Sequence, residues 1–175
     1  SYSNKGYKRE FAPYMKVSVT DNKLTLTANV QYRYIDFDYK DLNTPTPIDF
    51  NMIKWNFINY GLGVTYNIND NTNVYYSFGR NNKEASRLDM FGGLDYYDSE
   101  VFEKLASEYV YDNEFGFRYK KDRFTLEVPF YHMNFKNELA LNGLINQQGI
   151  HLHSSTNKSY RYGVELKLSY VNRLS

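Results

Sequence analysis

Cysteine is missing from this chain of 175 residues, so disulfide bonds, thiolate metal sites and thiol nucleophiles are excluded. An excess of one charge is missing too, because Lys and Arg total 21 while Asp and Glu total 20, which argues against a nucleic-acid partner. Mean hydropathy is −0.67, and no apolar run approaches the roughly 20 residues of a transmembrane helix. Neither a G-x-S-x-G elbow, a P-loop nor an H-E-x-x-H zinc motif is present. We therefore expect neither an enzyme nor a resident cofactor or metal.

Aromatic residues and asparagine are abundant instead. The chain has 19 Tyr, 12 Phe and 20 Asn, but only 4 Pro. Aromatic side chains favour strands, and Asn favours the turns between them. Hydrophobic residues make up 42% of the chain, which is too many for a disordered segment. The composition indicates an all-β protein, and it also fits an outer-membrane β-barrel, where only every second strand residue meets lipid.

Hydrophobic side chains recur at every second position in four segments, near 24–34, 58–68, 124–131 and 160–170. A period of two places alternate side chains on opposite faces of a strand, whereas a helix would scatter them around its axis. We predict that one face carries Leu24, Leu26, Leu62, Val64, Leu126, Val128, Leu166 and Leu168. The opposite face is predicted to carry Arg33, Arg118, Glu127 and Lys167.

Seven strands are predicted, at 11–20, 24–39, 52–68, 72–83, 109–120, 123–138 and 158–171. Short turns join them at 21–23, 69–71 and 120–122, and long polar links at 40–51, 84–108 and 139–157. Long strands, with short turns at one end and long loops at the other, are typical of outer-membrane barrels. We therefore predict that residues 1–175 form a single region, an antiparallel meander that is a segment of a large transmembrane β-barrel.

Two further expectations follow from this pattern. Pro129 lies inside a strand and has no N–H to donate, so it predicts a bulge or an unpaired position. Seven is an odd number of strands for a bacterial barrel, and both ends of the chain look cut, so we expect a fragment of a larger barrel. Without lipid, its free edges and apolar face predict a homo-oligomer.

Residues 108–168 carry three short sequence motifs on successive predicted strands. Tyr111, Glu114, Gly116 and Arg118 form a Tyr-x-x-Glu-x-Gly-x-Arg segment at the start of a strand. The next strand ends in Phe-x-Asn-Glu at 135–138, and a later one contains Gly-Val-Glu at 163–165. This pattern resembles the late barrel strands of TonB-dependent receptors of the bacterial outer membrane.

The resemblance implies a large barrel that is filled by an N-terminal plug domain. Such receptors import scarce nutrients, such as ferric siderophores, haem, cobalamin or glycans. Their energy comes from the TonB complex of the inner membrane, which pulls a short N-terminal box. The implied partners of the intact receptor are therefore outer-membrane lipid, the plug domain, the TonB complex and the transported ligand. Neither plug nor box is expected within these residues.

Charged residues on the predicted polar face are the first candidate site. They are Arg33, Asp112, Glu114, Arg118, Glu127, Glu165 and Lys167. In a barrel they point into the lumen, where they form a polar wall toward the plug or a passing ligand. The alternative is a set of hydrated charges that are paired across strands.

The long link 84–108 is the second candidate, as an extracellular ligand-binding loop. Its candidate residues are Arg87, Asp95, Tyr96, Tyr97, Asp98 and Glu100. Carboxylates at Asp95, Asp98 and Glu100 suit Ca²⁺, but their spacing is not that of an EF-hand, and an acidic loop is usually just solvated. His151 and His153 are spaced to share one face of a strand and bind a metal or haem iron, or they are two exposed loop residues.

Aromatic residues near the predicted strand ends suggest a girdle at a membrane interface. They are Tyr32, Tyr34, Trp55, Tyr60, Tyr76, Tyr111, Phe117, Tyr119, Tyr131, Tyr160 and Tyr170. Ordinary β-propensity, or aromatic platforms that stack on sugars or bases, explain the same residues. The alternative to a barrel segment is accordingly a soluble carbohydrate-binding β-sandwich, in which strands are shorter and two sheets pack face to face.

Overall fold

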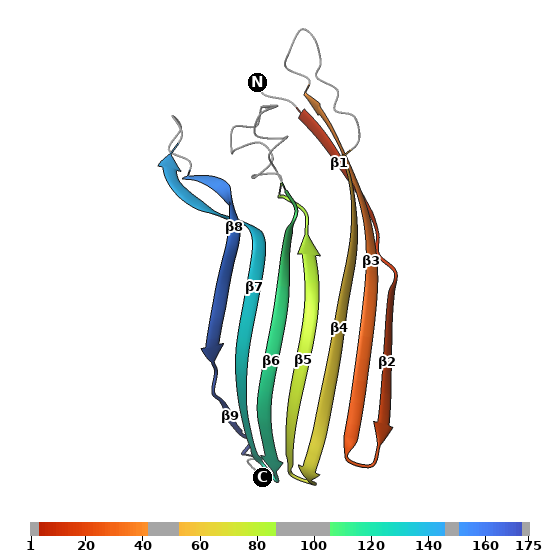
Figure 1. Ribbon diagram of the computed structural model, residues 1–175, viewed down its shortest axis with the longest axis vertical. Coiled ribbons are helices and arrows are strands. Elements are labelled where there is room, and N and C mark those ends of the chain that lie inside the picture. Colours follow the sequence, from red (N-terminus) through yellow and green to blue (C-terminus); the bar gives the residue numbers. More distant parts are fainter. Residues whose placement is uncertain (1–3, 42–52, 87–105, 146–150, 173–175) are drawn as a thin grey trace.

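In the computed structural model, all regular structure of the described residues belongs to one antiparallel β-sheet (Figure 1). The structure describes residues 4–41, 53–86, 106–145 and 151–172. Their strands are β1 (Asn4–Phe11), β2 (Tyr14–Asp21), β3 (Leu24–Asp41), β4 (Ile53–Asn69), β5 (Thr72–Lys83), β6 (Glu108–Lys121), β7 (Phe124–Ile145), β8 (His151–Val164) and β9 (Lys167–Tyr170). Within these ranges no helix is long and apolar enough to cross a membrane. The predicted all-β class is confirmed.

Between the two edges, strands that are neighbours in the sheet are also neighbours in the sequence. From β3 to β8, each strand pairs antiparallel with the next one along the chain. β1 and β2 both pair with β3, while β8 and β9 both pair with β7. The predicted antiparallel meander is therefore confirmed for the described residues.

Three tight turns close one end of the sheet, at the bottom of Figure 1. They join β2 to β3, β4 to β5 and β6 to β7. The first residue of two of these turns has a positive φ, 48° at Asn22 and 51° at Asp122. Short polar side chains tolerate this left-handed region better than other non-glycine residues do. The turns predicted near residues 22, 70 and 121 are confirmed.

At each outer edge of the sheet, two strands lie end to end and share one strand position. At one edge the interruption includes Pro13, and at the other it lies opposite Pro129. β1 and β2 pair with β3 in one continuous register on either side of Pro13. The Pro13 carbonyl accepts the N–H of Tyr32 at 3.1 Å, but the proline has no N–H to return. The ladder therefore loses one bond here without a change in register.

Pro129 produces the same interruption at the other edge. β8 and β9 pair with β7 in one continuous register on either side of Glu165. The N–H of Glu165 donates to the Pro129 carbonyl at 3.0 Å, and the proline cannot donate in return. The predicted bulge or unpaired position does not occur at Pro129 itself, because β7 continues through Pro129, which pairs with Gly116 of β6, and the break falls instead in the facing edge strand at Glu165. The nine strands thus fill seven positions across the sheet, which is the predicted number.

Two predicted boundaries are wrong. Much of the predicted link 139–157 is strand, because β7 continues to Ile145 and β8 begins at His151. At the other end, β1 already begins at Asn4, whereas the first strand was predicted to start at residue 11. A neighbour that is already extended offers free backbone partners, and a polar segment can use them as well as an apolar one.

The strand register separates the side chains into the two predicted faces. One face carries Leu24, Leu26, Leu62, Val64, Leu126, Val128 and Leu168, and the opposite face carries Arg33, Arg118, Glu127 and Lys167. The predicted apolar residue Leu166 lies between β8 and β9 and is 65% exposed. The apolar face is open to solvent in this chain, and Leu62 for example is 58% exposed. We call it the outward face and its opposite the concave face.

The apolar side chains change face part of the way along two strands. On β3 they point outward from Leu24 to Tyr34, and beyond that point the outward positions are Asp36, Asp38 and Lys40. On β4 the outward positions become apolar from Ile58 onward, at the level where this residue pairs with Tyr32. The outward apolar band therefore ends at one common level on both strands.

The length of this band suits a bilayer. Residues 24–34 rise about 33 Å along the strand, at about 3.3 Å per residue. A strand tilt of about 40° converts that length to about 25 Å along a barrel axis, the height of the apolar band of an outer-membrane barrel.

The concave face holds the buried core of the described residues, most of it at the loop end, whereas Tyr75 lies near the tight turn between β4 and β5. Its buried apolar side chains are Ile35, Phe37, Tyr39, Phe57, Tyr75, Ala85 and Phe135. Ala85, just beyond β5, packs with Phe37 and Tyr39 of β3, and Leu139 of β7 is partly buried against them. Because these elements are not neighbours in the sheet, the face that they share is curved inward.

We predict that Pro129→Ala closes the gap between β8 and β9. The new N–H points at the Glu165 carbonyl, and one net hydrogen bond stabilises the sheet by about 1 kcal/mol. Amide hydrogen exchange followed by mass spectrometry should show slower exchange in 163–169 than in the unmodified protein. Val128→Ala, which leaves the ladder donors unchanged, is the control. Equal exchange in the Pro129→Ala and unmodified proteins would show that proline does not cause the break.

Candidate functional site

The seven charged candidates all lie along the concave side of the sheet. The polar wall consists of Arg33 on β3, Asp112, Glu114 and Arg118 on β6, Glu127 on β7, Lys167 on β9 and Glu165 between β8 and β9. Glu165 is joined by its backbone to Pro129, which stands opposite Gly116 in the register of that face. The contacts of these residues divide the wall into separate groups rather than one cluster.

Tyr75 of β5 organises the first group and is 6% exposed. Its hydroxyl donates to Glu114 Oε1 at 2.5 Å and lies 3.5 Å from Glu127 Oε1. The Arg118 guanidinium carbon lies 3.8 Å from the centre of the Tyr75 ring, and Arg118 Nε donates to Glu127 Oε1 at 2.8 Å. Charge-assisted bonds and the cation–π contact thus fix three charged side chains around one ring.

A glycine opposite a tyrosine leaves room for the ring to lie flat on the sheet. Tyr75 stands directly opposite Gly116, and a Cβ on this glycine would lie 2.3 Å from two ring carbons. Tyr131 and Gly163 repeat the arrangement, with the tyrosine oxygen 2.5 Å from the position of a Cβ. No other residue fits beneath these rings without displacing them.

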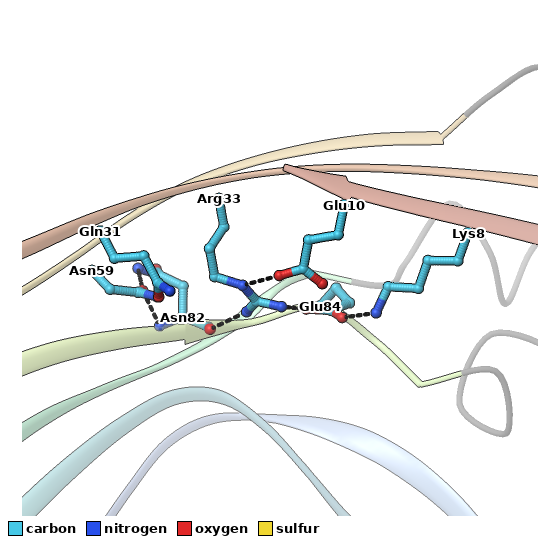
Figure 2. Close-up of polar contacts among 7 residues, drawn as sticks. All are labelled: Lys8, Glu10, Gln31, Arg33, Asn59, Asn82 and Glu84. Atoms are coloured by element: carbon cyan, nitrogen blue, oxygen red, sulfur yellow. Dashed lines mark hydrogen bonds and ion pairs between the residues drawn. The ribbon is translucent and has the colours of Figure 1, made fainter. Parts of the chain in front are cut away.

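Arg33 organises a second group at the loop end of the concave face (Figure 2). Arg33 Nε donates to Glu10 Oε1 of β1 at 2.7 Å, and Arg33 Nη2 lies 3.4 Å from Glu84 Oε2, just beyond β5. Lys8 of β1 forms a further ion pair with Glu84. The side chain of Arg33 is 18% exposed and that of Glu84 is 13% exposed. This array therefore ties the end of β5 to β1 across the concave face, largely shielded from water.

Amide side chains replace backbone pairing where β4 and β5 separate. The ladder between these strands ends at Tyr60 and Arg80. Beyond it, Asn59 Oδ1 accepts the backbone N–H of Asn82 at 2.8 Å and its side-chain amide at 2.9 Å (Figure 2). Asn59 Nδ2 in turn donates to Gln31 Oε1 of β3 at 3.0 Å. Asn59 and Asn82 are each 9% exposed, so their polar atoms need these partners.

Asp112 keeps one oxygen without a partner. Its Oδ1 is buried and accepts no hydrogen bond from the described part of the chain. The residue lines a hollow of about 280 Å³ on the concave face, together with Gly61, Gly63, Ser77 and Gly79. A buried acceptor that lacks a donor is costly, so this hollow suits an incoming N–H or O–H group.

The Phe-x-Asn-Glu pattern fastens β7 to both of its neighbours. Asn137 has a φ of 54°, and its Nδ2 donates to the Ser107 carbonyl, just before β6, at 3.2 Å. Glu138 accepts hydrogen bonds from Ser159 and Arg161 of β8. These residues therefore have a structural role in the hairpins.

The predicted ligand-binding loop lies outside the described residues. This holds for Arg87, Asp95, Tyr96, Tyr97, Asp98 and Glu100, so both the ligand and the calcium interpretations remain predictions. His151 and His153 lie in β8, opposite Ile145 and Leu141, rather than in the predicted loop. A metal role for these two histidines also remains a prediction.

Nine of the eleven predicted girdle aromatics occupy outward positions. They are Tyr32, Tyr34, Tyr60, Tyr76, Tyr111, Phe117, Tyr119, Tyr160 and Tyr170. Trp55 and Tyr131 were wrongly included. Trp55 packs against the core cluster around Phe37, and Tyr131 lies over Gly163 on the concave face.

The buried contacts of the concave face were not predicted from the sequence. Tyr75, Asn59 and Asn82 were not singled out, although each satisfies a neighbour across strands. A signal was available on β3, where the apolar positions shift from even to odd numbers after Tyr34. That shift marks where the concave face becomes the buried one.

Comparison with known proteins gives a consistent result. A family model described as TonB dependent receptor-like, beta-barrel matches residues 2–174. No curated protein matches the chain in sequence.

Three solved structures are similar along almost all of the chain. The copper transporter OprC has a TM-score of 0.73 and 13% identity, over 94% of this chain and 27% of OprC. The ferric-catecholate import receptor Fiu from K12 E. coli has a TM-score of 0.65 and 15% identity, over 95% and 26%. The alcaligin outer membrane receptor FauA from Bordetella pertussis has a TM-score of 0.66 and 15% identity, over 95% and 28%. The chain thus spans about a quarter of the length of these proteins, and the likeness is one of fold.

We predict that Gly116→Ala destabilises the folded protein by about 1–3 kcal/mol, because the new methyl group overlaps the Tyr75 ring. Denaturant unfolding monitored by fluorescence measures this free energy. Gly63→Ala is the matched control, since the nearest atoms to its Cβ are 3.9 Å away. In a Tyr75→Ala background the cost of Gly116→Ala should largely disappear. An unchanged cost there would rule out the ring as its cause.

We predict that the tie between Glu84 and β1 weakens at acid pH. Burial raises the pKa of Glu84, but the bond with Lys8 and the charge of Arg33 outweigh it, so this pKa lies below its ordinary value of 4.5. The carboxylate therefore stabilises the fold above pH 4.5, and this contribution disappears as the pH falls through the lowered pKa. Glu84→Gln should destabilise the protein by about 1 kcal/mol at pH 7 and by much less at pH 3. A difference between the two proteins that does not change with pH would contradict this.

Proposed function

Because the chain belongs to the family of TonB-dependent receptor-like β-barrels, we propose that it forms part of the barrel wall of a receptor that imports a small nutrient across the bacterial outer membrane. The observation that carries this proposal is the strict separation of the two faces. The outward face presents an apolar band of membrane height, and the concave face presents the polar wall. Such a sheet suits a barrel that has lipid on one side and a polar passage on the other.

The polar wall suits a surface against which a plug domain and a ligand slide. Most of its charged side chains already have partners, since Arg33 forms ion pairs with Glu10 and Glu84, and Arg118 forms one with Glu127. A wall of neutralised charges stays polar without holding a passing ion tightly. Asp112 is the exception, because its buried oxygen is left for a donor from the plug or the ligand. Energy for import is proposed to come from the TonB complex, acting through the plug.

Among siderophores, haem, cobalamin and glycans, we favour a metal complex as the ligand. Two of the similar structures are named for a metal or a ferric ligand, namely the copper transporter OprC and the ferric-catecholate receptor Fiu. The carbohydrate-binding β-sandwich is not favoured. Its two packed sheets require short strands, whereas β3 has 18 residues and β7 has 22, and the described strands form one sheet.

We predict that cells producing the receptor accumulate at least one labelled metal complex, and that accumulation stops when the proton-motive force is dissipated. The assay offers a panel of radiolabelled ferric and cupric chelates, haem and cobalamin to cells with and without the receptor. Binding to the surface should survive the uncoupler, whereas accumulation should not.

Two results would contradict the proposal. Accumulation that is equal in cells lacking the receptor would remove its role in import. Accumulation that persists after uncoupling would indicate passive diffusion through an open barrel rather than energised uptake.

A further inference from the structure

A cluster of positive charge lies on the outward face, at the loop end of the apolar band. Arg80 of β5 has its guanidinium carbon 4.8 Å from the centre of the Tyr109 ring and 5.8 Å from that of Tyr111. Its Nε is buried and has no hydrogen-bond partner among the described residues. An arginine whose guanidinium is held on aromatic rings is a positioned cation that can bind an anion through its other N–H groups.

Two lysines extend the cluster across the next strands. Lys136 of β7 places its Nζ 5.6 Å from the centre of the same Tyr109 ring. Lys158 of β8 stands directly opposite Lys136 in the ladder. Like charges at directly opposed positions destabilise a sheet, so this pair has a cost that a bound anion would remove.

No carboxylate on this part of the outward face balances these charges. At the described outward positions of β4 to β8, up to Lys136 on β7, the register places no Asp or Glu. The nearby acidic residues Asp112 and Glu114 lie on the concave face, and Glu138 is bound by Arg161. The three cations therefore face outward without a counter-charge from the described chain.

An apolar groove begins beside this cluster. Phe78 stacks against Tyr111 with ring centres 6.2 Å apart. Phe78 also lines an apolar groove of about 610 Å³ on the outward face, together with Val17, Leu26, Ala28, Leu62 and Tyr76. The same surface thus offers cations at one end and a hydrocarbon-sized groove at the other.

We propose that Arg80, Lys136 and Lys158 bind the phosphate of a membrane lipid, with an acyl chain of that lipid lying in the groove below Phe78. The site would fix the lipid at the boundary between the apolar band and the polar loops. A soluble anion fits less well, because the cations sit directly above an apolar surface that lipid covers in the membrane. This inference concerns the outward face and does not depend on which nutrient the lumen carries.

The test uses the intact receptor, purified in dodecyl maltoside and examined by native mass spectrometry. The probes are dioleoyl phosphatidic acid and dioleoylglycerol, which share their acyl chains but differ in the phosphate. Inorganic phosphate is added separately as a competitor. The variants are Arg80→Gln with Lys136→Gln, and Lys158→Gln alone, whose side chain is exposed. Lys54→Gln is the matched control, because Lys54 also faces outward but stands opposite Asp36.

The expected result is retention of phosphatidic acid over dioleoylglycerol, reduced about tenfold in the double variant and less in Lys158→Gln. Lys54→Gln should retain phosphatidic acid like the unmodified receptor. Ala28→Phe, which fills the groove, should weaken retention of the lipid without affecting inorganic phosphate. Equal retention of both lipids, or unchanged retention in both charge variants, would overturn the proposal. Complete displacement by millimolar inorganic phosphate would reassign the site to a free anion.

Discussion

The backbone register of seven strand positions, which shifts only near strand ends at Asn67–Asn69 and Leu141–Ile145 among the described residues, is the constraint on which the rest of this structure depends. Side chains alternate between faces, so a slip of one residue in any hairpin would turn the polar wall outward and the leucines inward. Both edges show how strictly the register is kept. At Pro13 and opposite Pro129 the ladder gives up a hydrogen bond, yet the pairing on either side continues in phase. At both prolines the sheet thus loses a hydrogen bond without a shift in register.

The central strands and the tight turns could be predicted because their pattern is local. Alternation over ten residues and a polar turn such as Asp-Asn-Lys at 21–23 are readable without knowing any partner. Strand ends were harder to place. Residues 139–145 and 151–157 become strand because each side of that hairpin offers the other a ladder, not because their own pattern demands it. Trp55 was assigned to the wrong face because the apolar residues of β4 change face two residues later.

The sequence pattern predicts which residues belong to the polar wall, but it does not predict which side chains those residues contact. Parity along a strand decides which face Glu114 or Arg118 occupies, and a single strand reveals it. The partner of Glu114 is Tyr75, 39 residues away, and Lys8 meets Glu84 across 76 residues. Such pairs depend on the registers of several hairpins together and on the inward curvature of the sheet. The glycines of the recognisable pattern illustrate the same limit, because Gly116 is explained only by the tyrosine that lies on it.

The level at which apolar side chains change face marks the boundary between the hydrocarbon of the membrane and the water on the loop side. On β3 it falls after Tyr34, and on β4 just before Ile58, and the register aligns these positions. If this hairpin moved toward the loop side, Ile58 and Tyr32 would rise out of the hydrocarbon. If it moved the other way, Asp36 and Asp38 would sink into the hydrocarbon, at a cost of kilocalories for each charge. The positions of apolar and charged residues along β3 and β4 thus determine the depth of the sheet in the membrane. They do so independently of how the barrel closes around these strands.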